Sequence, residues 1–381
     1  MISLFMVGLV IMDAWVYRSC ALYINFISPE PVGTQLIDAH FSAAVRSGVA
    51  QWMQTNSIED CQKALADPVQ LATELTPPVL AALIEAGTSL HALQERAWIH
   101  PVIHLRNVFE ATALPETPSA FVPIPEHPAT IAARAAAIVA LAMLNAQTVS
   151  YGSENDGHLF VNLVVLPGDG DFANKSKGDM RGHTDGVYFP IRGQEHELEK
   201  RFAPSPDFVC LSGLRNPDSV STTVMPLSSV LALLSPKDVE ELTKPQYVLR
   251  PQKTFRVGFK KLFGSDCQFL KPLPGVQLLF VGDNGHWIRF SHSAAVAEDD
   301  SSPASQAIGR FEQACLKCAD SVVVAPGDVV IVNNRIGLHG RSEVGGEPGG
   351  TSRWLLRTYG LDVEDLSEQQ RYSDSVFKLY P

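Results

Sequence analysis

The sequence has few cysteines and little positive charge. Its six cysteines are scattered over 381 residues and form no disulfide framework, which favours a reducing, cytoplasmic location. Cys315 and Cys318 have the spacing of a metal-binding pair, but no second pair completes a zinc site, so we interpret them as helical thiols. The net charge of −11 argues against nucleic acid or an anionic membrane surface as the main partner.

The chain also lacks a clear targeting or membrane-spanning segment. Met1–Met12 is almost wholly apolar and does not begin with basic residues. Asp13 and Arg18 interrupt the apolar character after Met12. A signal peptide needs positive charge first, and a membrane helix needs about 20 unbroken apolar residues. Residues 1–28 are therefore an uncertain N-terminal segment, which a start codon assigned too early would also explain. We expect a single domain over residues 29–381.

The first part of that domain, residues 29–147, has the apolar spacing of helices. Pro77-Pro78 is expected to begin a new helix, since proline is tolerated only in a helix's first turn. An alanine-rich stretch before residue 147 is expected to lie along a sheet. The expected helices are Gln35–Ser47, Ser57–Glu74, Val79–Glu95 and Ala129–Leu144.

Residues 148–362 consist of short β-branched runs separated by glycine and proline, which predict strands. Pro326-Gly327-Asp328 is expected to join the last two runs into a hairpin, and Gly168–Arg181 and Gly345–Gly350 are expected to be loops. The expected strands are Leu159–Leu166, Phe208–Leu211, Ser221–Met225, Gln277–Val281, Ser321–Ala325 and Val329–Asn333.

Many short strands with glycine-rich turns favour a sandwich or barrel over alternating βαβ units. The expected fold class is therefore α+β with a mainly β core. Its architecture would be a double-stranded β-helix (jelly roll), residues 148–362, wrapped by N-terminal and inserted helices.

Three residues of the β-rich part form a candidate metal site: His183, Asp185 and His339. Two imidazoles and one carboxylate hold Fe(II) on one face and leave the opposite positions open. A lone H-x-D is weak evidence in a chain with 11 histidines. At a strand end, however, His183 and Asp185 would point to the same side, because alternate residues share a face. His339 comes a few residues after the expected strand Val329–Asn333, where such a site needs its second histidine.

Two arginines downstream of His339 predict bound carboxylates. Arg353 and Arg357 are spaced by four in a strand-like segment and would point to the same side. A buried arginine is costly unless an anion pairs with it, and the guanidinium fork matches a dicarboxylate such as 2-oxoglutarate. In the competing interpretation the arginines form a solvated face, with Trp354 and Leu356 buried instead.

In these motifs the chain resembles the clavaminate synthase-like group of Fe(II)/2-oxoglutarate-dependent oxygenases. These are relatives of the taurine dioxygenases and often oxidise free amino acids. The resemblance runs from about residue 151 to residue 362. It is carried, in order, by Tyr151–Gly157, Gly182–Asp185, Pro206–Leu211, Leu214–Asn216, Thr222-Thr223, Pro326–Asn334, His339–Arg341 and Arg353–Arg357.

The resemblance implies roles for three sets of residues. The iron ligands would be His183, Asp185 and His339. The distal carboxylate of 2-oxoglutarate would be bound by Arg353 and Thr223. The amino acid head of the substrate would be bound by Arg357, Glu154 and Asn155. Asp185 departs from the group, in which glutamate is the commoner carboxylate ligand, and matches the taurine dioxygenases instead.

The expected reaction is hydroxylation of an unactivated C–H bond in a free amino acid or an amino-acid-derived small molecule. 2-Oxoglutarate and O₂ would be co-substrates, and succinate and CO₂ would be released. A desaturase or cyclase using the same site in natural-product biosynthesis is one alternative. A cupin-like metal protein that is not an oxygenase is another.

The side chain of the substrate is expected to be neutral or polar. Relatives that act on arginine place acidic residues shortly after an Arg-Tyr or Arg-Phe pair. In this chain Arg289-Phe290 is followed by Ser291-His292-Ser293, which carry no negative charge. The resemblance therefore predicts that arginine and lysine are not substrates.

Overall fold

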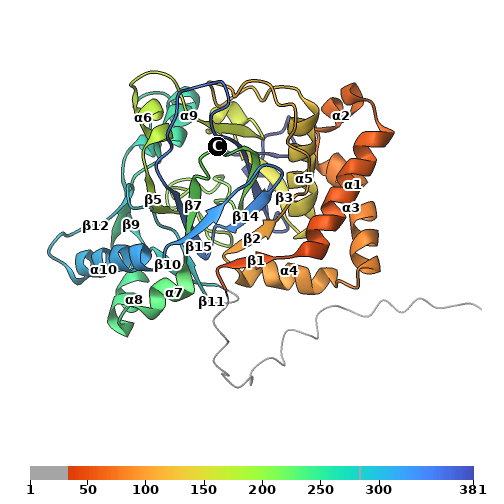
Figure 1. Ribbon diagram of the computed structural model, residues 1–381. Coiled ribbons are helices and arrows are strands. Elements are labelled where there is room, and N and C mark those ends of the chain that lie inside the picture. Colours follow the sequence, from red (N-terminus) through yellow and green to blue (C-terminus); the bar gives the residue numbers. More distant parts are fainter. Residues whose placement is uncertain (1–32, 283–284) are drawn as a thin grey trace, which may run out of the picture. The chain divides into compact units, whose positions relative to one another are not determined.

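Figure 1 shows the computed structural model, which describes residues 33–282 and 285–381. The contacts of residues 33–381 group into a single unit. The uncertain segment expected over residues 1–28 lies outside the described residues. None of the described helices combines the length and apolar character that a membrane span requires.

Helices dominate the described chain up to residue 143. Most of them begin at a residue whose side chain accepts a hydrogen bond from a first-turn N–H, as Asp38, Ser57, Asp67 and Ser89 do. The helices are α1 (Ala39–Thr55), α2 (Ile58–Ala64), α3 (Pro68–Glu85), α4 (Leu90–Ile99) and α5 (Pro128–Met143). Helix α5 confirms the predicted alanine-rich helix Ala129–Leu144 to within one residue at each end.

The expected helix start at Pro77-Pro78 was wrong, because both prolines lie inside α3. Helix α3 buries a stripe at four-residue spacing that crosses the prolines, made of Leu71, Leu75, Val79 and Leu83. Burying four such side chains is worth about 6–12 kcal/mol, against roughly 3 kcal/mol for each proline. Packing therefore outweighs the two missing N–H donors.

The first two predicted helices also had wrong bounds. Gln35–Ile37 is not helical but forms β1, which pairs in parallel with β2 (Val102–Leu105). The expected helix Ser57–Glu74 is split, because α2 ends at Ala64 and Asp67 caps the start of α3.

An eight-stranded sheet carries most of the β structure, in the order β1-β2-β14-β6-β16-β3-β17, with β4 also paired to β16. The further bounds are β3 (Gln147–Tyr151), β4 (Val161–Val164), β6 (Phe208–Arg215), β14 (Val329–Asn333), β16 (Trp354–Leu361) and β17 (Lys378–Leu379).

Helix α5 covers one face of this sheet and contacts β6, β14, β16 and β3. Alternation along β6 explains the two faces. Phe208 and Cys210 pack in the same apolar cluster as α5, whereas Val209 and Leu211 line a pocket on the other side. The face of the sheet opposite α5 is therefore available for a site.

A four-stranded sheet supplies the other wall, in the order β13-β7-β15-β5. Its strands are β5 (Met180–His183), β7 (Ser221–Pro226), β13 (Asp320–Val323) and β15 (Gly337–Arg341).

The predicted hairpin across Pro326-Gly327-Asp328 was wrong, because β13 and β14 lie in different sheets. The turn instead connects the two sheets. It leads from β13, which pairs with β7, to β14, which pairs with β2 and β6. Asp328 fixes this crossing, since its carboxylate contacts His104 Nε2 at 2.8 Å and accepts from the Asn107 N–H at 3.0 Å. Contacts with distant segments thus override the local turn signal.

The remaining elements surround the two sheets (Figure 1). They are α6 (Asp171–Lys177), α7 (Leu227–Ala232), α8 (Pro236–Leu242), α9 (Lys253–Phe263), α10 (Pro303–Lys317), β8 (Tyr247–Leu249), β9 (Leu273–Val276), β10 (Leu279–Gly282), β11 (Gly285–Ile288) and β12 (Ala295–Ala297). The expected loop Gly168–Arg181 instead contains α6 and the start of β5. Cys315 and Cys318 are free thiols at the end of α10. The fold is thus mixed α and β, with a large sheet flanked by helices.

Candidate metal centre and pocket

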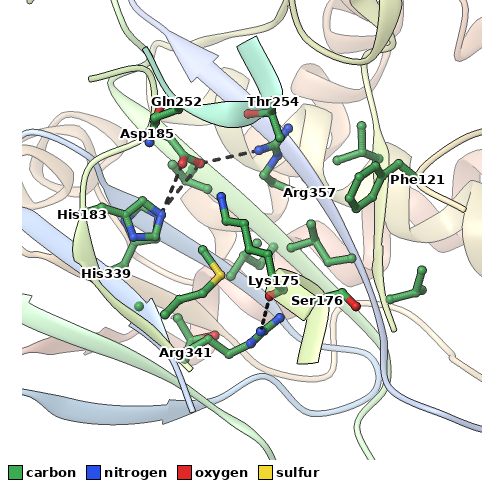
Figure 2. A pocket seen from close by; sticks show the side chains of 18 of the residues that line it. Phe121, Lys175, Ser176, His183, Asp185, Gln252, Thr254, His339, Arg341 and Arg357 are labelled. Atoms are coloured by element: carbon green, nitrogen blue, oxygen red, sulfur yellow. Dashed lines mark hydrogen bonds and ion pairs between the residues drawn. The ribbon is translucent and has the colours of Figure 1, made fainter. Parts of the chain in front are cut away.

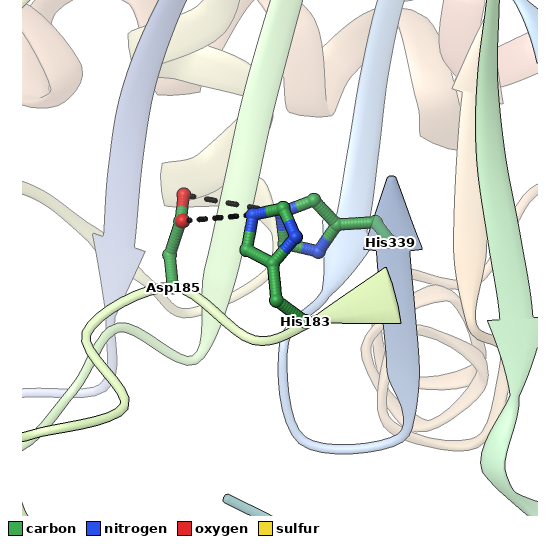
Figure 3. Close-up of side chains that lie close together, drawn as sticks. All are labelled: His183, Asp185 and His339. Atoms are coloured by element: carbon green, nitrogen blue, oxygen red, sulfur yellow. Dashed lines mark ion pairs between the residues drawn. The ribbon is translucent and has the colours of Figure 1, made fainter. Parts of the chain in front are cut away.

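His183, Asp185 and His339 come together where β5 ends (Figure 3). His183 is the last residue of β5 and pairs directly with His339 on β15. The Asp185 carboxylate lies 3.5 Å from His183 Nε2 and 3.9 Å from His339 Nε2. One ligand atom from each residue can be chosen so that all three lie within 4.8 Å of one another. The structure therefore brings the three predicted ligands together.

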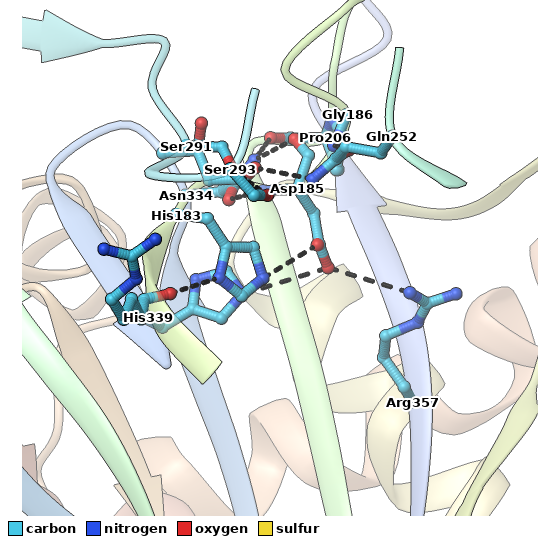
Figure 4. A network of polar contacts seen from close by, with 12 residues as sticks. His183, Asp185, Gly186, Pro206, Gln252, Ser291, Ser293, Asn334, His339 and Arg357 are labelled. Carbon is cyan, nitrogen blue, oxygen red and sulfur yellow. Dashed lines mark hydrogen bonds and ion pairs between the residues drawn. The ribbon is translucent and has the colours of Figure 1, made fainter. Parts of the chain in front are cut away.

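Asn334, the residue after β14, holds the backbone of Asp185 in place (Figure 4). Its side-chain oxygen accepts from the Asp185 N–H at 2.8 Å, and its amide donates to the Asp185 carbonyl at 3.0 Å. A third bond, to the carbonyl of Pro206, ties Asn334 to the segment before β6. His183 Nδ1 lies 3.1 Å from the Arg181 carbonyl, which leaves its Nε2 directed toward Asp185. These bonds hold the backbone of Asp185 and the ring of His183 in position.

The protonation states of the cluster suit a divalent cation. Burial, together with the charge of the neighbouring His183, lowers the pKa of His339 to about 4, so the imidazole is neutral at pH 7. Burial opposes ionisation of Asp185, but the hydrogen bond from His183 and the charges of His339 and Arg357 outweigh it. They hold the pKa of Asp185 well below its usual range. A neutral imidazole and an ionised carboxylate are forms that bind metal, so His339 and Asp185 fit a metal ion.

The cluster opens on a pocket lined by both sheets and by α6 (Figure 2). Apolar side chains make much of the wall, from Phe121, Val161, Leu163, Val164, Phe172, Val209 and Leu211. Polar and charged side chains outside the cluster also line the pocket, from Glu154, Asn155, Lys175, Ser176, Thr222, Gln252, Thr254, Arg341, Arg353 and Arg357.

Arg353, just before β16, is buried without a counter-charge. It is 4% exposed and forms no ion pair with any residue that the structure describes. Its Nε lacks a hydrogen-bond partner among those residues. Burial, together with the charge of Arg341, lowers the pKa of Arg353 to about 9. A buried guanidinium without an anion is costly, and the interpretation of a solvated face was wrong because Arg353 is buried.

Arg357, in β16, is paired with two carboxylates. Its guanidinium lies 2.7 Å from Glu154 and 3.7 Å from Asp185, and it stacks 4.3 Å from the centre of the Tyr359 ring. Burial lowers the pKa of Arg357, but Glu154, Tyr359 and Asp185 raise it above its ordinary value overall. Asn155 comes directly after Glu154 and also lines the pocket. Arg357 and Glu154 thus place a cation and an anion beside the metal cluster.

Thr223 does not reach the pocket, and its neighbour Thr222 does. On β7, Thr222 pairs with Arg341 and Thr223 pairs with Gly340 of β15. Directly paired residues share a face, so Thr222 lies on the pocket side with Arg341, and Thr223 lies on the other side. Thr222 lines the pocket and Thr223 does not. The prediction of Thr223 is therefore corrected to Thr222.

Ser291, His292 and Ser293 are not among the residues that line the pocket. Ser291 forms an isolated bridge with His183, and His292 Nδ1 lies 2.7 Å from the Gly182 carbonyl. Ser291 therefore lies beside His183, and His292 lies beside Gly182. That these positions offer no counter-charge to a cationic side chain stays a prediction.

Sequence reasoning missed several lining residues that lie outside the ligand motifs. Lys175 lies in α6, Arg341 is two residues after His339, and Gln252 and Thr254 lie at the start of α9. The spacing of Arg341 from His339 was a usable signal, because alternate strand residues share a face. The others reach the pocket through tertiary packing, and no local pattern marks them.

Comparison with known proteins places this geometry in a family. Residues 120–359 match the family model "Taurine catabolism dioxygenase TauD, TfdA family". The L-lysine 3-hydroxylase of Catenulispora acidiphila is 23% identical, over 91% of this chain and 89% of the relative. The L-asparagine oxygenase of Streptomyces coelicolor is 26% identical, over 58% of this chain and 60% of the relative.

Solved structures of similar fold cover the chain more fully. Asparagine oxygenase in complex with Fe(II), hydroxyasparagine and succinate superposes with a TM-score of 0.69 at 21% identity, covering 92% of this chain and 100% of that one. The non-heme iron oxygenase OrfP in complex with Fe and alpha-ketoglutaric acid gives a TM-score of 0.67 at 20% identity, covering 91% of this chain and 99% of that one.

Proposed function

Because the chain belongs to the taurine catabolism dioxygenase TauD, TfdA family, we propose that it hydroxylates a free amino acid or an amino-acid-derived small molecule. Fe(II) and 2-oxoglutarate are its cofactor and co-substrate. The observation that carries the proposal is the two-histidine, one-carboxylate cluster beside a pocket that holds Arg353 and Arg357. Family membership sets aside the cupin-like alternative.

We infer that the two sheets are the walls of a double-stranded β-helix. The chain passes from the eight-stranded to the four-stranded sheet between β6 and β7, back between β13 and β14, and across again between β14 and β15. Repeated crossing of this kind is the connectivity of a jelly roll. It supports the fold expected from the sequence and explains why a pocket lies between the sheets.

His183, Asp185 and His339 would bind Fe(II) through one face of its coordination sphere, leaving the other positions for 2-oxoglutarate and O₂. When bound, the iron supplies the oxidising chemistry that activates O₂ and attacks the substrate. Asn334 keeps Asp185 in position during this chemistry, since it fixes both the N–H and the carbonyl of that residue. The apolar wall around Phe121 and Phe172 would exclude water from the reacting atoms.

Arg353 and Thr222 would bind the distal carboxylate of 2-oxoglutarate. The carboxylate would provide the counter-charge that the buried Arg353 lacks, in the two-pronged geometry that suits a guanidinium. The Thr222 hydroxyl would donate a further hydrogen bond.

Arg357 and Glu154 would bind the amino acid head of the substrate, with Asn155 beside them. Arg357 keeps one buried donor, Nε, without a partner among the described residues, and a substrate carboxylate would accept from it. Glu154, which is 4% exposed, would accept from the substrate ammonium. An amino acid as substrate is supported by the relatives L-lysine 3-hydroxylase, L-asparagine oxygenase and enduracididine beta-hydroxylase.

The test is release of succinate from 2-oxoglutarate with each standard amino acid, at equal iron and co-substrate. Mass spectrometry of the amino acid distinguishes hydroxylation, a gain of one oxygen atom, from desaturation, a loss of two hydrogens. Coupled turnover with at least one amino acid is the expected result. Succinate release that no amino acid stimulates would contradict the proposal.

A further inference from the structure

The pocket holds more positive than negative charge. Its lining includes four cationic side chains, Lys175, Arg341, Arg353 and Arg357, but only two carboxylates, Glu154 and Asp185. Bound Fe(II) and 2-oxoglutarate would cancel each other's charge, and an amino acid head carries one charge of each sign. Two positive charges therefore remain uncompensated in the loaded pocket.

Lys175 is the cation best placed to act on a substrate. Figure 2 shows its side chain extending from α6 into the space between Asp185, His183 and Arg357. It forms no ion pair with any residue described by the structure, whereas Arg357 pairs with Glu154 and Asp185. Lys175 is an exposed residue. Desolvation by the surrounding side chains lowers its pKa, while Asp185 and Glu154 oppose that effect. Its ammonium group thus faces the pocket without a dedicated counter-ion.

The backbone of Lys175 is held from several sides. Arg341 donates to the carbonyls of Lys175 and Gly178, at 3.1 and 2.5 Å. The backbone carbonyl of Lys177, also in α6, accepts from the Val344 N–H at 2.7 Å. At the other end of α6, Asp171 pairs with Lys253 of α9 at 2.9 Å. The contacts of Arg341 and Val344 hold the backbone of α6, so the lysine side chain extends from a positioned helix.

We propose that Lys175 selects an anionic substrate side chain, so that the substrate is an acidic amino acid of the aspartate or glutamate type. The inference rests on the proposed function, because Arg357 and Glu154 must bind the amino acid head. An anionic side chain would pair with the Lys175 ammonium, a neutral one would gain no such pair, and a cationic one would be repelled by it. Arginine and lysine stay excluded, and an anionic side chain replaces the neutral or polar one that was expected from the sequence.

The experiment compares isosteric pairs, aspartate with asparagine and glutamate with glutamine. Wild-type enzyme should turn over one acid with a kcat/KM on the order of 10- to 100-fold above that of its amide, the range for one hydrogen bond to a charged group. Lys175→Met should lose that preference through KM and keep the weaker amide activity. Lys175→Arg should retain the preference. Binding of the same four amino acids to the anaerobic Fe(II)/2-oxoglutarate complex, by calorimetry, gives a readout independent of turnover.

Lys177→Met is the matched control, since this lysine lies on the same helix but does not line the pocket. It should leave both the acid preference and the binding unchanged. Preference of the wild type for an amide or for lysine would overturn the inference while leaving the proposed function intact. Equal loss for acids and amides in Lys175→Met would overturn it as well, because that result indicates a purely structural role. Failure of every amino acid to support succinate release would count against the proposed function itself.

Discussion

His183 and His339 face each other across two neighbouring antiparallel strands, with their ring centres 4.5 Å apart. Glycines beside them allow the strands to approach. A Cβ on Gly340 would lie 2.1 Å from the Met180 carbonyl oxygen, and one on Gly182 would lie 2.6 Å from Met225 Sδ. The histidines are thus paired by strand register, while Asp185 joins them from the turn after β5.

Replacing His183 or His339 with alanine should abolish iron-dependent succinate formation. Each supplies one of three protein ligands, and the other two cannot hold the ion on one face. Iron content after dialysis and the rate of succinate release are the measurements. His91→Ala, at an exposed helix position, is the control and should behave as wild type. Wild-type turnover in either ligand variant would refute the site.

Arg353→Lys should raise the 2-oxoglutarate requirement strongly. An ammonium group cannot reproduce the two-pronged contact with a carboxylate, and the mismatch costs on the order of 2–5 kcal/mol for a buried pair. Saturation curves for 2-oxoglutarate at fixed substrate check this. An unchanged co-substrate affinity would show that another residue binds the distal carboxylate.

Thr222→Val and Thr223→Val form a matched pair one residue apart. Only Thr222 faces the pocket, so only its loss should weaken 2-oxoglutarate binding, by roughly 1 kcal/mol or about fivefold. The dissociation constant for 2-oxoglutarate, measured with both variants, decides between the two positions. A larger effect at Thr223 would restore the assignment made from the sequence.

Arg357→Gln should raise the KM for the amino acid, on the order of 10- to 100-fold, with a much smaller effect on 2-oxoglutarate. The reason is that Arg357, beside Glu154, would bind the substrate carboxylate, whereas Arg353 is the buried cation without a counter-charge. The KM for the amino acid and the KM for 2-oxoglutarate should be measured in both the Arg353 and the Arg357 variant, so that each variant serves as the control for the other. Iron affinity should also be measured, because Arg357 lies 3.7 Å from Asp185. The same KM pattern in both variants would contradict the division of roles.

Asp207→Ala should destabilise the protein by about 3–5 kcal/mol, because it leaves Arg335 buried without its counter-charge. The two side chains are 0% and 1% exposed and 2.8 Å apart, and Asp207 also accepts from the Asp362 N–H. Urea unfolding midpoints give the change in stability. Glu195→Ala breaks the exposed pair with Lys200 and should cost less than about 1 kcal/mol. Equal effects of the two substitutions would contradict the prediction.

The sequence alone named the three residues of the metal cluster, because H-x-D and the spacing of His339 from Arg353 are recognisable patterns, and the fold brings them together. It also determined helix α5 and strand β14, whose apolar periodicity agrees with their final surroundings. Where local signals and packing disagreed, packing prevailed. The apolar stripe of α3 carried the helix through Pro77 and Pro78, and the turn at Gly327 became a crossing between sheets.

Tertiary structure alone decided which threonine faces the pocket and which lysine enters it. Thr222 and Thr223 are chemically equivalent in sequence, and only the pairing of β7 with β15 assigns their faces, since a shift of one residue reverses every side chain. Lys175 reaches the site because Arg341, Val344 and Lys253 hold α6 from distant parts of the chain. Such long-range contacts have no local sequence signal, because each joins residues that only folding brings together.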